Sequence, residues 1–426
     1  KRRFSLYRTV QFSVLLLALT VLTMGVARFY ALDSAPRGFY FDEASAANHA
    51  FCVSDTGRDS TQGRPLPLFF LTESSGFHSA PYVYVAAAWT TLFGRSIGAL
   101  RALSAVATTL TIVGLFLLAR ATLGTRAALF TVVTASLSPW AFQFSRIAWD
   151  NPLYPMFLIF GLHLLWTAGG PARAIGSALL FALAMYTYAP ARLVAPMIIA
   201  LVFSVRLLRR SMSWAIAVPF LLVLVVSLYS MVDDMLHGPI NDRAKAISLY
   251  TAYLHSGVLP TLKLFARQLL AHFSLDFLLL RGDPFNLRRS TWHFGVLSWL
   301  DVVGLASYAV ATIVAVRRRQ GCADLLLLLP CAYLIALLPS PLTTESVPHA
   351  LRAIGAWPFV ALASGYGLAQ LTERHRWGAL LVTVLGVAFS TKFLITFFLL
   401  YPVESADWID VQEQHRLAPL DRTALL

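Results

Sequence analysis

The sequence predicts an all-α integral membrane protein, and three observations support this fold class. The 426 residues are 58% hydrophobic and only 13% charged, whereas soluble proteins are about 45–50% apolar and about 25% charged. Long apolar runs recur along most of the chain, and a helix that is apolar on every side must face lipid or a very large core. Basic residues concentrate in the segments between alternate runs. Together these observations exclude a soluble enzyme.

Eleven apolar runs predict membrane-spanning helices, each of which needs about 20 mostly apolar residues. Pro190 and the charge of Arg192 separate the fifth run from the sixth. The first run is longer than the apolar part of a signal peptide, so we expect it to be a retained helix. The runs cover residues 9–31, 99–119, 127–145, 152–168, 174–190, 191–206, 213–231, 296–316, 323–339, 353–371 and 377–401.

The charge distribution predicts which ends of these helices are cytoplasmic. The apolar stretch 80–93 is short for a span, and we expect it to form a juxtamembrane helix on the outer surface. The inner loops then hold 15 basic and 2 acidic residues, and the rest of the chain holds 19 of each. Because positive charge concentrates on the cytoplasmic side, we expect a cytoplasmic N-terminus and an external C-terminus.

The whole chain, residues 1–426, is expected to form one polytopic domain with two large external loops, 32–98 and 232–295. Each loop contains an apolar-periodic stretch, 44–53 and 259–273, that is typical of an amphipathic helix at the membrane interface. The three cysteines lie far apart, without the spacing of a zinc site. The net charge of +13 rests on arginine, and no basic soluble domain is present, so we exclude nucleic acid as a partner.

The acidic residues indicate where the chemistry lies. Eighteen of the 21 fall on the predicted outer face, whereas Lys392 is the clear case of a charge within an apolar run. Ion-coupled transporters place ionisable groups near the membrane midplane. The scarcity of such groups argues against a transporter and favours a reaction at the outer membrane–water interface.

Three carboxylates are the candidate catalytic residues. Asp42 and Glu43 follow a cluster of aromatic residues shortly after the first helix, and Asp150 lies in the short turn between the third and fourth helices. The alternative is that Asp42 and Asp150 merely cap the helices that follow them. Both are fixed beside helix ends on the same side of the membrane, so they are expected to converge on one cavity, as a general base requires.

A series of short motifs follows one another along nearly the whole chain. They are Asp42-Glu43, His78-Ser-Ala-Pro81-Tyr82, Leu92-Phe93-Gly94, Arg101-Ala-Leu-Ser-Ala, Ser145-Arg146 with Asp150, Phe273 to Leu278 with Gly282-Asp283, and Pro348 to Gly355. In their order, these motifs resemble the GT-C superfamily of glycosyltransferases, and most closely glycosyltransferase family 39. This family includes protein O-mannosyltransferases and lipid A aminoarabinose transferases and has many bacterial members, so the resemblance implies a location in the bacterial cytoplasmic (inner) membrane.

The resemblance implies a GT-C fold of about 11 transmembrane helices, with juxtamembrane helices in the first external loop. It also implies a polyprenyl- or dolichyl-phosphate-linked monosaccharide as donor. Asp42 matches the family's catalytic acidic position, Glu43 its partner, and Asp150 the second acidic residue of the substrate site. The sequence departs from the family at Ser79-Ala80, where two prolines are common. It also lacks the Glu-Lys-Pro-Pro stretch of the aminoarabinose transferases.

We expect an inverting transfer of a hexosyl or pentosyl group in which Asp42 is the general base. The leaving phosphate needs positive charge, preferably arginine. Arg352 and Arg192 rank first because each adjoins a helix end that faces the proposed cavity. The alternative for each arginine is an interaction with lipid head groups. The other candidates for binding donor phosphate or substrate are Arg146, Arg288, Arg289, His349, His78 and Tyr82.

Metal dependence, acceptor and function class each leave alternatives open. Glu73 and His78 are tentative ligands of a divalent cation, although a structural or proton-transfer role suits His78 better. The chain shows no sizeable outer domain, so we expect a lipid or glycan acceptor rather than a protein, with membrane lipids around it. The alternative functions are a flippase or transporter of lipid-linked sugars and a non-catalytic scaffold.

Overall fold

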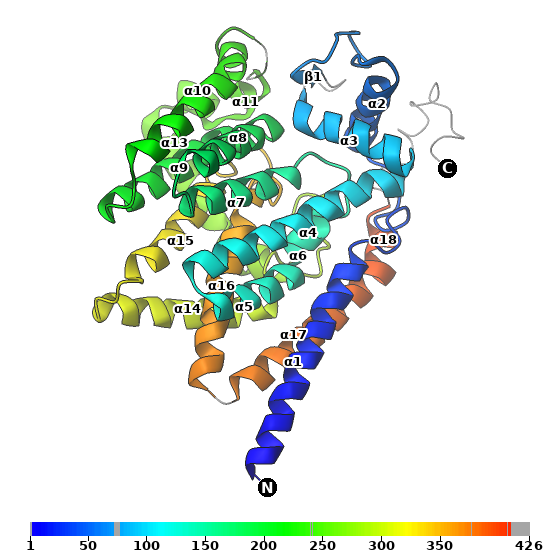
Figure 1. Cartoon of the computed structure of the whole chain (residues 1–426). Helices are drawn as coiled ribbons and strands as arrows, with labels where there is room; N and C mark the ends of the chain where they lie inside the picture. Colours follow the sequence, from blue (N-terminus) through cyan, green and yellow to red (C-terminus); the bar gives the residue numbers. More distant parts are fainter. Residues whose placement is uncertain are drawn as a thin grey trace.

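A computed structural model describes residues 2–71, 77–238, 240, 242–375, 377–406 and 408–409. Regular structure in this part of the chain is almost entirely helical, with one short antiparallel hairpin (Figure 1). The hairpin pairs β1 (Phe69–Leu71) with β2 (Phe77–Ser79). Single turns of 3₁₀ or π helix cover Asp276–Leu280, Leu287–Arg289, Ile354–Ala356 and Thr396–Leu400. The α-helices are α1 (Arg2–Ala27), α2 (Phe41–Thr56), α3 (Ala80–Phe93), α4 (Ile97–Thr122), α5 (Thr125–Leu137), α6 (Pro139–Phe144), α7 (Leu153–Trp166), α8 (Pro171–Thr187), α9 (Ala191–Leu208), α10 (Trp214–His237), α11 (Asp242–Ile247), α12 (Leu249–Ser256), α13 (Val258–Ala271), α14 (Trp299–Arg317), α15 (Ala323–Leu337), α16 (Trp357–Arg374), α17 (Gly378–Ile395) and α18 (Tyr401–Glu404).

Each of the predicted apolar runs contains a helix. Five helical segments in the described residues are long and apolar enough to cross a membrane: α4, α9, α10, α14 and the continuous segment Gly378–Glu404. Shorter apolar helices cover Phe12–Ala27, Thr125–Leu137, Leu153–Trp166 and Ala323–Leu337. The chain is therefore a multi-pass membrane protein with the all-α fold class that its composition predicts.

The predicted single run 127–145 is divided into α5 and α6, so one uninterrupted helix is wrong here. Ser138 adopts an extended backbone conformation, and its hydroxyl accepts a hydrogen bond from the backbone N–H of Ala141 at 3.2 Å. Pro139 occupies the first position of α6, where its missing N–H costs nothing. The chain therefore ends one helix and starts another just before it reaches the turn that carries Asp150.

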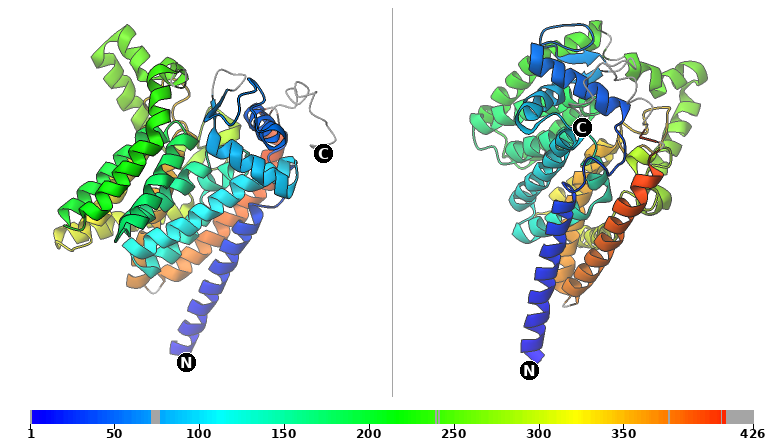
Figure 2. Two further views of the ribbon diagram at one scale, coloured as in Figure 1. Left: turned by 45° about the horizontal axis from the view of Figure 1, so that its top comes forward. Right: turned by 90° about the vertical axis from the view of Figure 1, so that its right-hand side faces the viewer.

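The segments predicted to be external gather at one end of the bundle. Trp140 Nε1 donates to the carbonyl oxygen of Ala350 at 2.9 Å, and Gln143 Nε2 donates to that of Arg288 at 3.1 Å. Helices α2 and α3 and the hairpin lie at this end (Figure 1), and the long helices run roughly parallel to one another (Figure 2, left). The described parts of the two large loops are thus brought together, although which side of the membrane they face stays a prediction.

Helix α3 remains at this end of the bundle along its whole length. Its N-terminus follows β2 directly. Beyond its C-terminus, Arg95 Nη1 donates to Asp55 Oδ2 near the end of α2 at 2.9 Å. Trp89 Nε1 donates to the carbonyl of Ala99 in the first turn of α4 at 2.8 Å. This arrangement agrees with the expectation that residues 80–93 form a surface helix, on which the assignment of the loops to two sides depends.

Candidate active site

Helix α2 presents Asp42 at its first turn. The helix begins at Phe41, and Tyr40 occupies the N-cap position in an extended conformation. Asp42 therefore lies within the first turn, and the alternative interpretation that it caps the helix is wrong. Asp42 is partly exposed, whereas Glu43 next to it is 1% exposed. The two neighbouring carboxylates therefore have different environments.

Glu43 is fully engaged by four donors. Arg101 donates from Nε to Oε1 and from Nη2 to Oε2, both at 2.9 Å, and the Arg101 side chain is completely buried. The backbone N–H of Ala148 donates to Oε1 at 2.7 Å, and that of Tyr40 donates to Oε2 at 3.0 Å. Ala148 precedes Asp150 by two residues and Tyr40 precedes Asp42 by two, so one buried ion pair fixes both acidic segments relative to each other.

Asp150 lies in the turn between α6 and α7 and is partly exposed. Its carbonyl oxygen accepts from the N–H of Leu153 at 3.1 Å, and Pro152 directly precedes α7. Burial of the carboxyl group, followed by the negative charge of Asp42, raises the pKa of Asp150 to about 7, against smaller opposing effects of nearby N–H groups and Arg192. The charge of Asp42 therefore acts on Asp150, whereas the convergence of the two carboxylates on one cavity stays a prediction.

Two buried polar atoms near Asp150 have no hydrogen-bond partner among the described residues. They are Tyr82 Oη and Trp149 Nε1, on side chains that are 1% and 7% exposed. Burial raises the pKa of Tyr82 well above its usual value, and the charges of Glu43 and Asp150 raise it further. Buried polar groups are normally satisfied, so these two donors are suited to the hydroxyl groups of a bound molecule.

Two of the predicted arginines lie beside the acidic pair. Arg192, at the start of α9, is close enough to Asp150 to lower the pKa of that carboxyl. The guanidinium carbon of Arg288 lies 3.6 Å from the ring centroid of Tyr40. The Tyr40 and Trp149 rings are 5.9 Å apart, edge to face. Arg192 and Arg288 therefore bring positive charge to the residues that flank Asp42 and Asp150.

Arg146 holds the backbone rather than facing the acidic pair. Its side chain is fully buried and donates to carbonyl oxygens of the connection between α1 and α2 at 2.6–3.1 Å, which occupies all of its nitrogens. This geometry does not support the prediction that Arg146 binds the donor phosphate. Arg146 instead supplies the donors that an irregular buried backbone requires. The carbonyls belong to Ala27, Arg28, Tyr30, Ala31 and Ala35.

Arg352 and His349 belong to a neighbouring polar cluster in the connection between α15 and α16. Arg352 Nη1 donates to Thr343 Oγ1 at 2.6 Å and to the carbonyl of Glu345 at 2.8 Å. His349 Nδ1 lies 4.0 Å from Asp283 Oδ2, which also lies 3.3 Å from Arg289 Nη1. The sequence ranks Arg352 first, together with Arg192, among the candidates for binding the phosphate. Because Arg352 has local hydrogen-bond partners, Arg288 becomes a better candidate than Arg352.

His78 lies apart from the acidic pair in contact with His49. The two rings are 5.9 Å apart, and burial together with His49 lowers the pKa of His78 to about 3, which leaves it neutral. Glu73, its tentative partner in binding a cation, lies outside the described residues. No cluster of three or more His, Cys, Asp or Glu that could hold a metal is present in the part of the chain that the structure describes.

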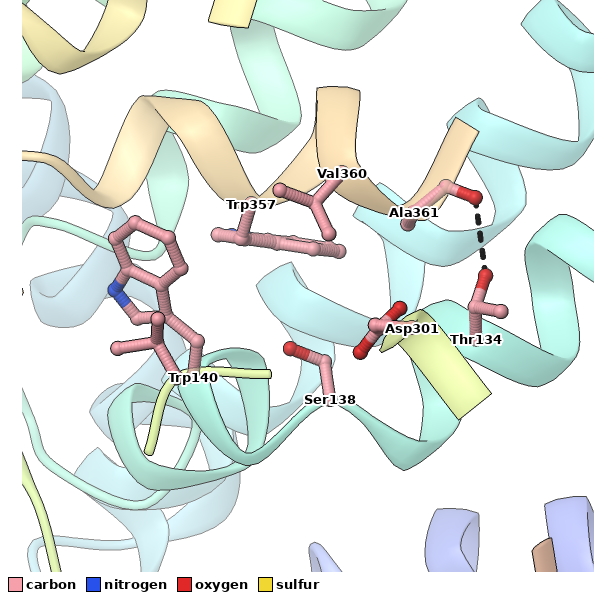
Figure 3. A pocket seen from close by; sticks show the side chains of 8 residues that line it. Thr134, Ser138, Trp140, Asp301, Trp357, Val360 and Ala361 are labelled. Carbon is pink, nitrogen blue, oxygen red and sulfur yellow. Dashed lines mark hydrogen bonds between the residues drawn. The ribbon is translucent and has the colours of Figure 1, made fainter. Parts of the chain in front are cut away.

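A recess deeper in the bundle does not provide another acid–base site. Figure 3 shows Asp301, Ser138, Trp140 and Trp357 around it. Asp301 Oδ2 accepts from the N–H and the hydroxyl of Ser298 at 2.8 and 2.7 Å, which caps α14. This carboxylate stabilises a helix end, so the acidic pair remains the better candidate.

Sequence reasoning missed the roles of Arg101, Tyr40 and Trp149. Arg101 was noted only as part of a motif, and its partner Glu43 is 58 residues away. The sequence does contain a signal for this pairing, because Arg101 is a basic residue in an apolar helix and Glu43 is an acidic residue in an apolar segment. Such charges are costly unless paired, so their pairing could have been inferred.

Comparison with known proteins supports the overall fold of the chain. Residues 78–229 match the family described as dolichyl-phosphate-mannose-protein mannosyltransferase. ArnT from Cupriavidus metallidurans, solved with bound undecaprenyl phosphate, superposes with a TM-score of 0.53 at 16% identity, over 88% of this chain and 63% of ArnT. The chain has the GT-C fold. The fold that the resemblance implies is thereby confirmed.

A second group of similar structures comes from Archaeoglobus fulgidus. Its oligosaccharyltransferase superposes with a TM-score of 0.54 at 14% identity, over 92% of this chain and 55% of that protein. The enzyme AglB, solved with an inhibitory peptide and dolichol phosphate, gives a TM-score of 0.52 at 14% identity, over 92% and 56%. This chain therefore spans 55–63% of the length of these proteins. No curated sequence matches it significantly.

The raised pKa of Asp150 predicts a pH-dependent stability. Between its ordinary value of 3.8 and about 7, the folded protein binds more protons at this group than the unfolded chain, so stability falls as pH rises through this window. Asp150→Asn removes this contribution. We expect the melting temperature of wild type, relative to the variant, to fall up to about pH 7 and then to level off. A constant difference across the titration in detergent would contradict the assignment.

Proposed function

We propose that this protein is an inverting glycosyltransferase that moves a monosaccharide from a polyprenyl-phosphate carrier to an acceptor hydroxyl on the outer face of the membrane. The observation that carries the proposal is the Glu43 carboxylate, which accepts from the N–H groups of Tyr40 and Ala148 and so holds the segments of Asp42 and Asp150 together, with Arg192 and Arg288 beside them. The GT-C fold, shared with ArnT and AglB structures that contain polyprenyl-type phosphates, supports the choice of donor.

In the proposed reaction Asp42 is the general base. Its carboxylate takes the proton of the acceptor hydroxyl as that oxygen attacks the anomeric carbon. The bond between this carbon and the phosphate oxygen breaks, and the electron pair leaves with the polyprenyl phosphate. Attack on the face opposite the leaving group inverts the anomeric configuration. General base catalysis contributes roughly 10²–10⁴-fold to such a step.

The environment of Asp150 suits a different role from that of Asp42. With a pKa near 7, Asp150 is partly protonated at neutral pH, so it can donate a hydrogen bond to a sugar hydroxyl while Asp42 accepts the proton of the acceptor. Tyr82 and Trp149 would supply further donors to the sugar.

Positive charge stabilises the leaving phosphate. Arginine is suited to this task because its planar guanidinium matches two phosphate oxygens. Of the predicted candidates, Arg192 and Arg288 lie beside the acidic pair, and we propose that they bind the donor phosphate. Glu43 is a positioning residue, since its oxygens are occupied by Arg101 and two backbone donors.

The direct test of the base is Asp42→Asn. The reconstituted protein is incubated with a panel of synthetic polyprenyl-phosphate hexoses and pentoses, and release of polyprenyl phosphate is measured. We expect kcat to fall by roughly 10²–10⁴-fold with little change in KM. Asp55→Asn, which removes an exposed carboxylate from the other end of α2, is the matched control and is expected to keep its activity. Wild-type turnover by Asp42→Asn would overturn the proposal.

The two arginines predict a different kinetic signature. Loss of a charge-assisted hydrogen bond weakens binding by about 1.5–3 kcal/mol, or roughly 10–100-fold, so Arg192→Ala and Arg288→Ala should raise KM for the lipid donor. Arg281→Ala is the matched control because Arg281 is exposed and pairs with Asp276. An unchanged KM in both test variants would contradict the proposal that these two arginines bind the donor phosphate.

A further inference from the structure

The hairpin of α12 and α13 forms a surface that the proposed reaction does not use. Its two helices pack against each other. The helices that follow α10 stand out from the edge of the bundle in both views of Figure 2. On α13, Gln268 is buried and Phe265 is partly buried, so one face of the helix is directed inward. The opposite face has no partner among the described residues.

That opposite face is an apolar stripe. Leu259, Leu262, Ala266 and Leu270 follow one another at intervals of three, four and four residues, which places them on one side of a helix. The three leucines are 63%, 57% and 68% exposed. A row of large apolar side chains with this exposure marks a surface that contacts another apolar phase.

Basic residues flank the stripe. Lys263 and Arg267 are both exposed, and they lie four residues apart on the same helix. The segment 249–272 contains no aspartate or glutamate. Two exposed tyrosines on α12, Tyr250 and Tyr253, have ring centroids 6.3 Å apart. Apolar side chains beside Lys, Arg and Tyr are the composition of a helix that lies in a membrane interface.

The hairpin is fastened at the C-terminal end of α13. His272 Nε2 lies 2.7 Å from the hydroxyl of Ser340, and its Nδ1 lies 2.9 Å from the carbonyl oxygen of Gln268. The hydroxyl of Ser340 also accepts from the backbone N–H of His349 at 3.2 Å. The position of α13 is therefore tied to the loop that carries His349 and Arg352.

We propose that α13 lies on the outer bilayer surface, with the apolar stripe in the boundary between head groups and acyl chains and with Lys263 and Arg267 on anionic phospholipid head groups. Two observations favour lipid over a protein partner. The positive charge is complementary to anionic lipid. The surface also follows α10 along the chain, after the short helices α11 and α12. Helix α10 is long and apolar enough to cross a membrane, and its apolar side chains remain largely exposed, among them Leu222, Val225, Val226 and Tyr229.

The test places a fluorophore on the stripe of the full chain. Cys52, Cys322 and Cys331 are replaced by alanine, and Leu262→Cys is labelled with an environment-sensitive dye. The protein is reconstituted in nanodiscs of phosphatidylcholine, alone or mixed with phosphatidylglycerol, that contain head-group-proximal spin-labelled lipid. Gln62→Cys, exposed in the loop after α2, is the matched control. We expect quenching at residue 262 several-fold stronger than at residue 62, and stronger still with phosphatidylglycerol.

The charge reversal Lys263→Glu with Arg267→Glu separates the two parts of the proposal. Both residues are exposed, so this variant is expected to fold, which circular dichroism checks. It should abolish the extra quenching by phosphatidylglycerol at residue 262. Equal quenching at residues 262 and 62 would overturn the membrane contact and leave the surface to water or a protein. A phosphatidylglycerol effect that survives charge reversal would overturn the role of the two basic residues.

Discussion

The carboxylate of Glu43 is the constraint on which the arrangement of the site depends. It joins three separate segments, because it binds the Arg101 side chain on α4, the Tyr40 N–H before Asp42 and the Ala148 N–H before Asp150. A buried ion pair is stable only when its remaining hydrogen-bonding positions are satisfied. Here four donors satisfy it, and the two backbone donors fix the positions of Asp42 and Asp150.

Arginine serves two purposes at this end of the bundle. Arg101 and Arg146 are fully buried and direct their nitrogens to backbone carbonyls and to Glu43. They replace the water that an irregular connection would otherwise need. Arg192 and Arg288 are partly exposed and lie beside the acidic pair. Arg101 and Arg146 therefore support the backbone, whereas Arg192 and Arg288 provide accessible positive charge. Amino-acid composition alone does not distinguish these two kinds of arginine.

The sequence predicted the helices, because hydropathy is local. It also predicted that Asp42 and Asp150 lie beside helix ends, whereas their convergence on one cavity stays a prediction. It did not predict the break at Ser138, where a cap and Pro139 interrupt a continuously apolar run. The partners of Arg146 and Arg352 also escaped prediction, because tertiary contacts decide whether an arginine meets carbonyls, carboxylates or solvent.

The central claim, that Asp42 and Asp150 share one electrostatic environment, is tested most directly by measuring the pKa of Asp150 in wild type and in Asp42→Asn. Infrared titration of protein labelled with ¹³C-aspartate reports the carboxyl group, and Asp150→Asn identifies its band. We expect a wild-type value near 7 that falls when the neighbouring charge is removed. An identical pKa in the two proteins would show that the carboxylates do not interact.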